Sequence, residues 1–319
     1  MKKITQIIRE YKKVAILSHK KPDGDAIGSS VGLSLILNNL GIDADVIQLD
    51  NIPSYLDFID NTNIKLYSGE KLSESYDCII CVDTADEKRV DDRYSLSENM
   101  PLIVIDHHAT NTYFGDFNYI FDDYSSTCEI IYDLFKEEEV FDNKIATALY
   151  TGISTDTNRF MYDNTSKNTL SVASNLVDMV DLNLINSKLY ANKKVEYWKL
   201  ISLAMQNAKF TYNGKIASVL ITKEMQDQAN YRDCDSIVEI LRDIDSVEIS
   251  LVVYYYSNSF KASFRTNSDF DVSNVAKIFS GGGHKKAAGA TLGYSDPVLI
   301  YEDVLKILEE EYARYNSSK

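Results

Sequence analysis

The chain has 319 residues, of which 45% are hydrophobic and 25% charged, and its formal net charge is −15. A chain of this length can bury two cores, and its acidic charge disfavours a protein that coats long nucleic acid through a basic surface. Four cysteines make no disulfide framework, and no stretch approaches 18 consecutive apolar residues. We therefore expect a cytoplasmic protein without a membrane span.

The first half of the chain alternates short β-branched runs with helical patterns. This alternation predicts an α/β fold with a doubly wound parallel sheet. One predicted helix ends at Gly41, and glycine is typical of helix C-termini. The expected strands cover 14–17, 44–49, 76–83 and 101–108, and the expected helices cover 26–41, 125–138 and 144–157.

The pattern changes after a predicted helix over 184–209. Strands and helices then mix, which predicts a smaller α+β domain with a mixed sheet. We expect a first domain over 1–190, a connecting helix over 191–209 and a second domain over 210–319. In the second domain the expected strands cover 215–221, 245–257 and 259–267, and the expected helices cover 231–244, 271–282 and 301–315.

All four histidines lie in dense polar motifs, and three of these histidines belong to the first domain. In open parallel sheets the functional crevice lies beyond the carboxyl ends of the strands. Three separate motifs at three such ends therefore predict one shared site, and a fourth motif, GISTDT, ends a helix. The candidate residues are His19, Asp23, Asp25, Asp83, Asp106, His107, His108 and Asp156.

Imidazole and carboxylate donors without thiolate suit Mn²⁺, Mg²⁺ or Fe²⁺ better than a structural zinc cage. The carboxylates and histidines are too many for one ion. Two ions that share a carboxylate would use them all, and such a pair can hold both the attacking and the leaving oxygen of an in-line displacement at phosphorus. Taken alone, Pro-Asp-Gly-Asp is more typical of a turn, but the convergence of the motifs favours a metal site.

The second domain offers two candidate phosphate-binding features. The three glycines of GGGHKKAAGA, residues 281–290, expose consecutive N–H groups that could form an anion-binding nest. A flexible glycine turn is the alternative. Arg265 in SFRTN could bind a phosphate through its two-pronged guanidinium, or it could be an exposed strand arginine. Neither a P-loop nor a dinucleotide-binding glycine motif is present.

These motifs resemble those of the DHH phosphoesterase family with its DHH-associated C-terminal domain. The segments HKKPDGDAIGSS, VDTAD, DHHATN and TGISTDTNRF match the N-terminal motifs of the family in order. SFRTN with GGGHKKAAGA resembles its nucleotide-binding domain. The resemblance covers nearly the whole chain, and it implies a metal-binding catalytic domain followed by a substrate-binding domain.

The resemblance also implies two divalent ions, most often Mn²⁺, with Asp83 bridging them. His108 would face the scissile phosphate, and Asp106 would orient the cluster. The matching ligands are His19, Asp23 and Asp83 for one ion, and Asp25, Asp83, His107 and Asp156 for the other.

The resemblance also bears on further positions outside the ligand set. Asn111 and Arg159 stand in or beside matching motifs as candidate contacts only. Asn158 stands where many relatives have glycine, which puts the local shape after the last metal motif in question. The implied substrate contacts are Arg265, Gly281, Gly282, Gly283 and His284.

The layout favours one type within the family. Its inorganic pyrophosphatases have a different C-terminal domain, its membrane-bound cyclic-dinucleotide phosphodiesterases carry N-terminal spans, and its large single-strand exonucleases add further domains. The short standalone type remains, the nanoRNases and pAp phosphatases. The resemblance thus implies an Mn-dependent exoribonuclease that hydrolyses short oligoribonucleotides and linear dinucleotides such as pApA and pGpG to mononucleotides, and that could also convert pAp to AMP.

Two alternatives stay open: a phosphodiesterase acting on cyclic dinucleotides directly, and a metal-containing nucleotide sensor without turnover. The expected partners are short RNA, linear dinucleotides and pAp, with no long nucleic acid and no membrane. The sequence does not fix the oligomeric state, and a homodimer is one compatible assembly.

Overall fold

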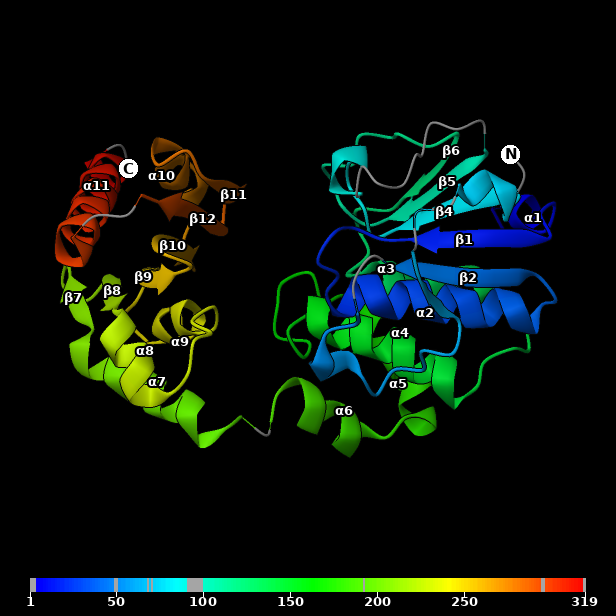
Figure 1. Ribbon diagram of the computed structural model, residues 1–319, viewed down its shortest axis with the longest axis horizontal. Helices are drawn as coiled ribbons and strands as arrows, with labels where there is room; N and C mark the ends of the chain where they lie inside the picture. Colours follow the sequence, from blue (N-terminus) through cyan, green and yellow to red (C-terminus); the bar gives the residue numbers. More distant parts are fainter. Residues whose placement is uncertain are drawn as a thin grey trace. The chain divides into compact units, whose positions relative to one another are not determined.

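The computed structural model describes residues 4–48, 51–67, 69, 71–90, 100–191, 193–293 and 296–317. By its internal contacts the chain divides into two compact units, Met1–Asn192 and Lys193–Lys319. Each unit contains one sheet with helices packed on it (Figure 1). Among the described helices, none combines the length and the hydropathy that a membrane span requires.

The first unit contains a six-stranded sheet in the order β3-β2-β1-β4-β5-β6. All of its strand pairs are parallel, and the order reverses at β1. The predicted doubly wound parallel sheet is therefore confirmed. Its strands are β1 (Lys13–Leu17), β2 (Asp43–Gln48), β3 (Ile64–Leu66), β4 (Cys78–Val82), β5 (Leu102–Asp106) and β6 (Phe117–Ile120).

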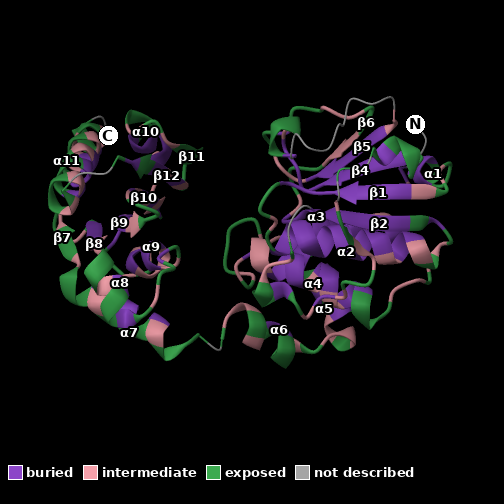
Figure 2. Cartoon of the chain, viewed as in Figure 1, coloured by how far each residue is buried: buried purple, intermediate pink, exposed green. Residues whose placement is uncertain are grey.

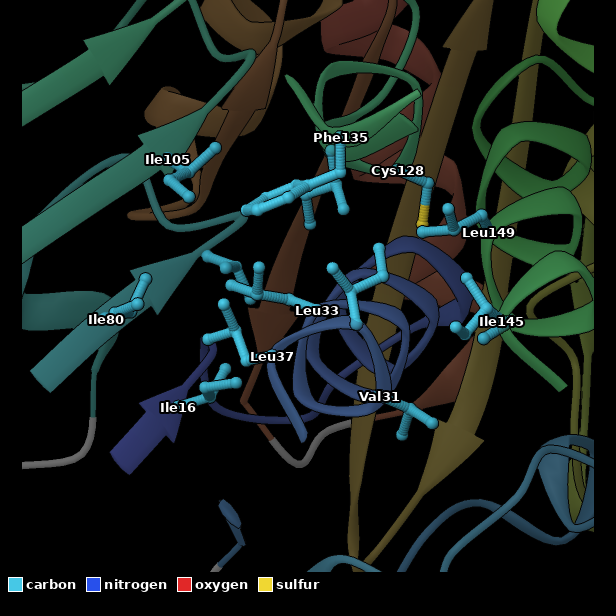
Figure 3. Packing of buried hydrophobic residues seen from close by; sticks show 14 of the residues in the cluster. Ile16, Val31, Leu33, Leu37, Ile80, Ile105, Cys128, Phe135, Ile145 and Leu149 are labelled. Atoms are coloured by element: carbon cyan, nitrogen blue, oxygen red, sulfur yellow. The ribbon is translucent and has the colours of Figure 1, made fainter. Parts of the chain in front are cut away.

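The core of the first unit lies between the sheet and its helices. Figure 3 shows Leu33 and Leu37 of helix α2 beside Ile16 and Ile80 of the strands. In Figure 2 the central strands and α2 are coloured almost entirely as buried. The helices are α1 (Ile4–Ile8), α2 (Gly24–Asn39), α3 (Thr127–Phe135), α4 (Asn143–Asp156), α5 (Lys167–Leu176) and α6 (Leu182–Leu189).

Helices α2 and α4 approach each other closely because α2 carries glycine at the contact. A Cβ atom on Gly28 would lie 2.5 Å from the carbonyl oxygen of Ala148. Gly41, which follows α2, has a φ of +84°, so the predicted glycine at the helix end is confirmed. Leu49, where the second strand was expected to end, lies outside the described residues.

The second unit contains a six-stranded mixed sheet in the order β11-β12-β10-β9-β8-β7. Only the β8–β9 pair is parallel, so the predicted mixed sheet is confirmed. The strands are β7 (Lys209–Thr211), β8 (Ile216–Ile221), β9 (Ile249–Tyr256), β10 (Ser259–Thr266), β11 (Gly282–His284) and β12 (Ala287–Leu292). The helices are α7 (Val195–Asn207), α8 (Lys223–Ala229), α9 (Ile237–Arg242), α10 (Val272–Ile278) and α11 (Pro297–Ser317).

Two local expectations are wrong. The helix expected over 184–209 is interrupted, because α6 ends at Leu189 and α7 begins at Val195. The glycine segment forms no nest: Gly282 and Gly283 belong to β11, which pairs antiparallel with β12. Successive N–H groups of a strand point in opposite directions, so they cannot converge on one anion as a nest requires.

Candidate metal centre

The carboxyl ends of β1, β4 and β5 carry the candidate metal ligands of the first unit. His19 lies two residues beyond β1, Asp83 directly follows β4, and Asp106 ends β5. The three strands are neighbours in the sheet, and the strand order reverses at β1. Open α/β sheets bind their ligands at such a point. The structure thus brings three motifs that are distant in sequence to one sheet edge.

Asp83 lies at the centre of this group. Its Oδ2 atom is 3.5 Å from His19 Nε2, and its Oδ1 atom is 3.6 Å from both His107 Nε2 and His108 Nδ1. The side chain is buried, and the backbone has a φ of +50°, a strained conformation for a residue other than glycine. Each oxygen of one carboxylate thus faces a different histidine, as a bridging ligand requires.

His19 and Asp23 form one side of the centre. His19 Nδ1 lies 2.8 Å from the carbonyl oxygen of Lys20, which favours a proton on Nδ1 and leaves Nε2 able to bind a metal. That Nε2 atom is 3.8 Å from Asp23 Oδ2. The other oxygen of Asp23 caps α2 by accepting the N–H groups of Asp25 and Ala26. The cap therefore fixes the direction of the free oxygen.

Asp25, His107 and Asp156 form the other side. His107 Nε2 lies 3.2 Å from Asp156 Oδ2, and Asp156 is the last residue of α4. Asp25 is completely buried, and its two oxygens accept the N–H groups of Thr127 and Cys128 at the start of α3. The partial positive charge of this helix N-terminus helps to keep a buried carboxylate in the folded protein.

The potential ligand atoms form three overlapping groups. Within each group the atoms all lie within 4.8 Å of one another. The groups are His19, Asp23 and Asp83; Asp25, His107 and Asp156; and Asp83, His107 and His108. The first group has the composition expected for one ion, and the second with Asp83 has the composition expected for the other.

Asp106 holds His108 in place. Its Oδ1 atom lies 2.7 Å from His108 Nδ1, and its Oδ2 atom accepts a 2.7 Å hydrogen bond from the Asn111 amide. The same amide nitrogen donates to the carbonyl of Thr84, and Asn111 Oδ1 accepts the N–H of Tyr113. The structure thus gives Asn111 a role in fixing Asp106, while its role as a substrate contact stays a prediction.

The electrostatics of the centre favour binding of a cation. Burial, together with the charge of Asp156, raises the pKa of Asp25 to about 7. Burial and the neighbouring aspartates raise the pKa of Asp83 well above its ordinary value. Burial would lower the pKa of His107, but the carboxylates of Asp156, Asp25 and Asp83 raise it to about 10. A divalent cation stabilises the ionised form of crowded carboxylates that would otherwise retain protons.

Asp106 differs from the other carboxylates. Burial alone would raise its pKa, but the hydrogen bonds from His108 and Asn111 outweigh burial and hold the pKa below its ordinary value. Asp106 is therefore ionised, and its negative charge stabilises a proton on the adjoining imidazole nitrogen.

The segment after α4 is strained. Asn158, Arg159 and Phe160 have φ values of 46°, 61° and 63°, so three consecutive residues other than glycine are left-handed. The Arg159 guanidinium lies over the ring of Tyr190, at 5.0 Å from its centroid. The Tyr190 hydroxyl lies 2.8 Å from Ser154 Oγ on α4. This stacking holds an arginine three residues from Asp156.

The sequence did not reveal the support behind Asp25. Glu129 of α3 is 1% exposed and accepts hydrogen bonds from Ser125, from Thr169 Oγ1 at 2.9 Å and from the Asn168 amide at 2.8 Å. These bonds fix the loop that leads into α3. A Ser-Ser-Thr-Cys-Glu run before an apolar stretch signals a helix N-terminus, but it does not show which carboxylate the helix meets.

A pocket of about 550 Å³ in the second unit contains part of the predicted substrate site. Arg265, Gly282 and Gly283 line it, together with Tyr231 and Glu239. The Arg265 guanidinium donates to the carbonyl of Phe264 and lies 3.5 Å from the Glu239 carboxylate. The structure therefore places the arginine and two of the glycines at one pocket.

Gly281 and His284 do not line this pocket. A Cβ atom on Gly281 would lie 2.3 Å from the carbonyl oxygen of Gly289, so the structure explains this glycine by close packing. His284 is exposed and pairs with Ala287 in the hairpin. Their roles as substrate contacts stay predictions.

An α/β sheet with histidine and carboxylate side chains gathered at its switch point is typical of metal-dependent hydrolases of phosphate esters. Comparison with known proteins identifies the family. Residues 13–153 match the DHH family, N-terminal domain, and residues 213–312 match the DHHA1 domain. The chain belongs to the DHH family and is a phosphoesterase, as its sequence motifs predicted.

Relatives of similar length match nearly the whole chain. The chain is 30% identical over 318 residues to the bifunctional oligoribonuclease and PAP phosphatase NrnA of Thermus thermophilus, covering 98% of this chain and 95% of that protein. It is 29% identical to the protein of the same name from Bacillus subtilis, covering 90% and 93%. The crystal structure of an exopolyphosphatase-related protein from Bacteroides fragilis superposes with a TM-score of 0.87 at 28% identity, covering 98% and 95%.

Proposed function

We propose that this phosphoesterase is a Mn²⁺-dependent enzyme that hydrolyses short oligoribonucleotides and linear dinucleotides to mononucleotides, and pAp to AMP. The observation that carries the proposal is the position of Asp83 between the histidines of two ligand groups. The relatives named as oligoribonucleases and PAP phosphatases support the substrate class.

The residues present fit two divalent ions. One would be held by His19, Asp23 and Asp83, and the other by Asp25, Asp83, His107 and Asp156. Nitrogen donors beside carboxylates favour Mn²⁺ over Mg²⁺, because Mg²⁺ prefers oxygen ligands. Bound ions would stabilise charge on the attacking and leaving oxygens at phosphorus.

His108 would act on the substrate through Nε2. Asp106 keeps a proton on Nδ1, so Nε2 is the ring atom left to meet a phosphoryl or leaving oxygen. In the reaction water attacks phosphorus, the bond from phosphorus to the 3′ oxygen breaks, and that oxygen takes up a proton. Asp106 and Asn111 would keep the imidazole oriented throughout.

The second unit would bind the nucleotide end of the substrate. Arg265 lines the 550 Å³ pocket with the glycines of β11 and could bind a phosphate in bidentate fashion. The Glu239 carboxylate lies beside Arg265 and neutralises part of its charge. The remaining positive charge of the guanidinium is therefore confined to the face of the pocket. We therefore assign metal binding and catalysis to the first unit and binding of the nucleotide end to the second.

The test is release of mononucleotides from pApA, a pentaribonucleotide, pAp and cyclic di-AMP by metal-stripped protein supplied with Mn²⁺ or Mg²⁺. We expect Mn²⁺-dependent cleavage of the linear substrates, reduced about a hundredfold or more in a His107→Ala, Asp156→Ala variant. An Asp178→Asn variant, changed at an exposed position of the same unit, should match the wild type. Cleavage of cyclic di-AMP alone, or no turnover of any substrate, would overturn the proposal.

A further inference from the structure

We propose that Lys20, Lys21, Lys88 and Arg89 bind the 5′-phosphate of the substrate beside the metal centre. This inference rests on the proposed function and assigns a ligand to a second group of side chains in the same unit. We call these four residues the basic rim.

The basic rim consists of two loops that touch. The first loop follows β1 and contains His19, and the second follows β4 and begins at Asp83. The Lys20 N–H donates a 2.8 Å hydrogen bond to the carbonyl of Arg89. His19 Nε2 is itself 3.5 Å from Asp83 Oδ2. Both loops therefore pass through the metal centre, and a backbone hydrogen bond joins them at residues that carry the cations.

The side chains of the rim are accessible to a ligand. All four side chains are exposed, and none forms an ion pair with any residue that the structure describes. In the same unit, by contrast, Lys65 and Lys188 contact aspartates at 2.5 and 2.6 Å. Four neighbouring cations without an acidic partner among the described residues are notable in a chain with 48 acidic and 33 basic residues.

Among the described residues of these loops, two carboxylates other than the expected metal ligands accompany the rim. Asp86 accepts the N–H of Lys88 and thereby caps the short helix Glu87–Arg89. Glu87 is the other carboxylate of this helix. Apart from the expected metal ligands, the described residues of the two loops thus carry four cations and two carboxylates, one of which is engaged by the backbone.

The backbone of the first loop supports the same conclusion. Lys21 has a φ of +54° and precedes Pro22, and this left-handed conformation is strained for a residue with a side chain. Strain of this kind is concentrated at functional sites, where surrounding contacts hold it. Here it sets the direction of the chain between the metal ligands His19 and Asp23.

The chemistry of the two proposed substrate types identifies the group that would bind. In pAp and in pApA alike, the bond that breaks joins phosphorus to the 3′ oxygen of a nucleoside that also carries a 5′-phosphate. One site for that 5′-phosphate would therefore serve both reactions. The carboxylates of the metal centre repel a second phosphate, so its partners must be cations outside the centre, and Arg89 can bind it in bidentate fashion.

Pairs of substrates that differ only in the 5′-phosphate test this inference. The kcat/KM ratios for pApA over ApA, and for pAp over adenosine 3′-phosphate, would be measured with Mn²⁺ in three proteins. These are the wild type, the rim variant K20Q/K21Q/K88Q/R89Q, and the control K12Q/K167Q, which removes two exposed charges elsewhere in the unit. We expect ratios of at least about ten in the wild type and the control, falling towards one in the rim variant mainly through KM.

The result that overturns the inference is a rim variant with wild-type ratios, or a wild type that does not distinguish the members of each pair. If no substrate is hydrolysed, the proposed function fails, and calorimetric binding of the same four compounds decides the inference alone. We then expect the wild type to bind the 5′-phosphorylated member of each pair more tightly than the other member. The rim variant should bind the two members of each pair equally, and any other pattern contradicts the inference.

Discussion

The Asp25 carboxylate accepts a 2.7 Å hydrogen bond from the backbone N–H of Thr127, 102 positions further along the chain. Thr127 begins α3, and the N-terminus of this helix directs its free N–H groups at the carboxylate. The candidate metal centre therefore depends on a helix that contributes none of its expected ligands.

The first prediction concerns Glu129, which supports that helix. In Glu129→Gln the amide nitrogen replaces one oxygen that accepts hydrogen bonds, so a buried acceptor is lost. We expect a loss of about 1–3 kcal/mol in the free energy of unfolding and about tenfold weaker Mn²⁺ binding, because Asp25 loses its fixed position. Thermal unfolding and metal titration measure the two effects.

Glu137→Gln is the matched control, because Glu137 follows the same helix and is exposed. It should leave both quantities unchanged. If Glu129→Gln lowers the stability but binds Mn²⁺ with wild-type affinity, Glu129 has a structural role only.

The second prediction concerns Gly152 on α4. A Cβ atom there would lie 2.3 Å from Cys128 Sγ and 2.7 Å from Asp25 Oδ1. Gly152→Ala must therefore displace α3 or Asp25, at a cost of about 1–3 kcal/mol, and activity should fall with the displaced carboxylate. Gly293→Ala, where a Cβ atom meets nothing within 4 Å, should leave stability and activity intact. Equal stability of the two variants would contradict the packing seen here.

The predictable part of the fold is its centre. Strands β1, β4 and β5 consist mainly of apolar residues, many of them β-branched, because both faces of a central parallel strand are buried. Strands β3 and β6 escaped prediction since they are short edge strands whose side chains are partly exposed. Their sequences carry no continuous apolar run. They are strands because they pair with β2 and β5, and this pairing is not visible in their own sequences.

The candidate ligands were predictable for a related reason. Polar side chains directly after a buried strand must lie at the edge of the sheet, so His19, Asp83 and His107 could be brought together from the sequence alone. The bonds that hold Asp25 could not, because they depend on how α3 packs against α2. The glycine hairpin also escaped prediction, since glycine is compatible with a turn and with an edge strand.

The third prediction concerns the left-handed residue Asn158. Asparagine tolerates its φ of 46° better than other residues with side chains, and glycine adopts it freely. We expect Asn158→Ala to lower the free energy of unfolding by about 1 kcal/mol, and Asn158→Gly to change it by less than about 0.5 kcal/mol. Denaturant unfolding measures both. Asn61→Ala, at an exposed position that is not left-handed, should be neutral. A neutral Asn158→Ala would show that the segment carries no strain.

The fourth prediction concerns pH and metal removal. The pKa of Asp25 rises from 3.8 to about 7 on folding, so between these values the metal-free folded protein binds more protons than the unfolded chain. Its stability must therefore fall as the pH rises through this window. The pKa of Asp83 is also raised, so this carboxylate likewise makes the stability fall as the pH rises. The pKa of His107 rises to about 10, so its stabilising charge is lost as the pH rises from 6.5 towards 10.

Divalent ions replace these protons, so the stabilisation that they give must grow with pH. We expect metal-free protein to unfold at a lower temperature at pH 8 than at pH 5.5, and Mn²⁺ to raise the Tm more at pH 8. Asp83→Asn should flatten both trends, because it removes the central charge, whereas the exposed Asp178→Asn should preserve them. A metal-free Tm that rises with pH, or an equal gain from Mn²⁺ at both values, would show that these carboxylates are not the groups that the metal neutralises.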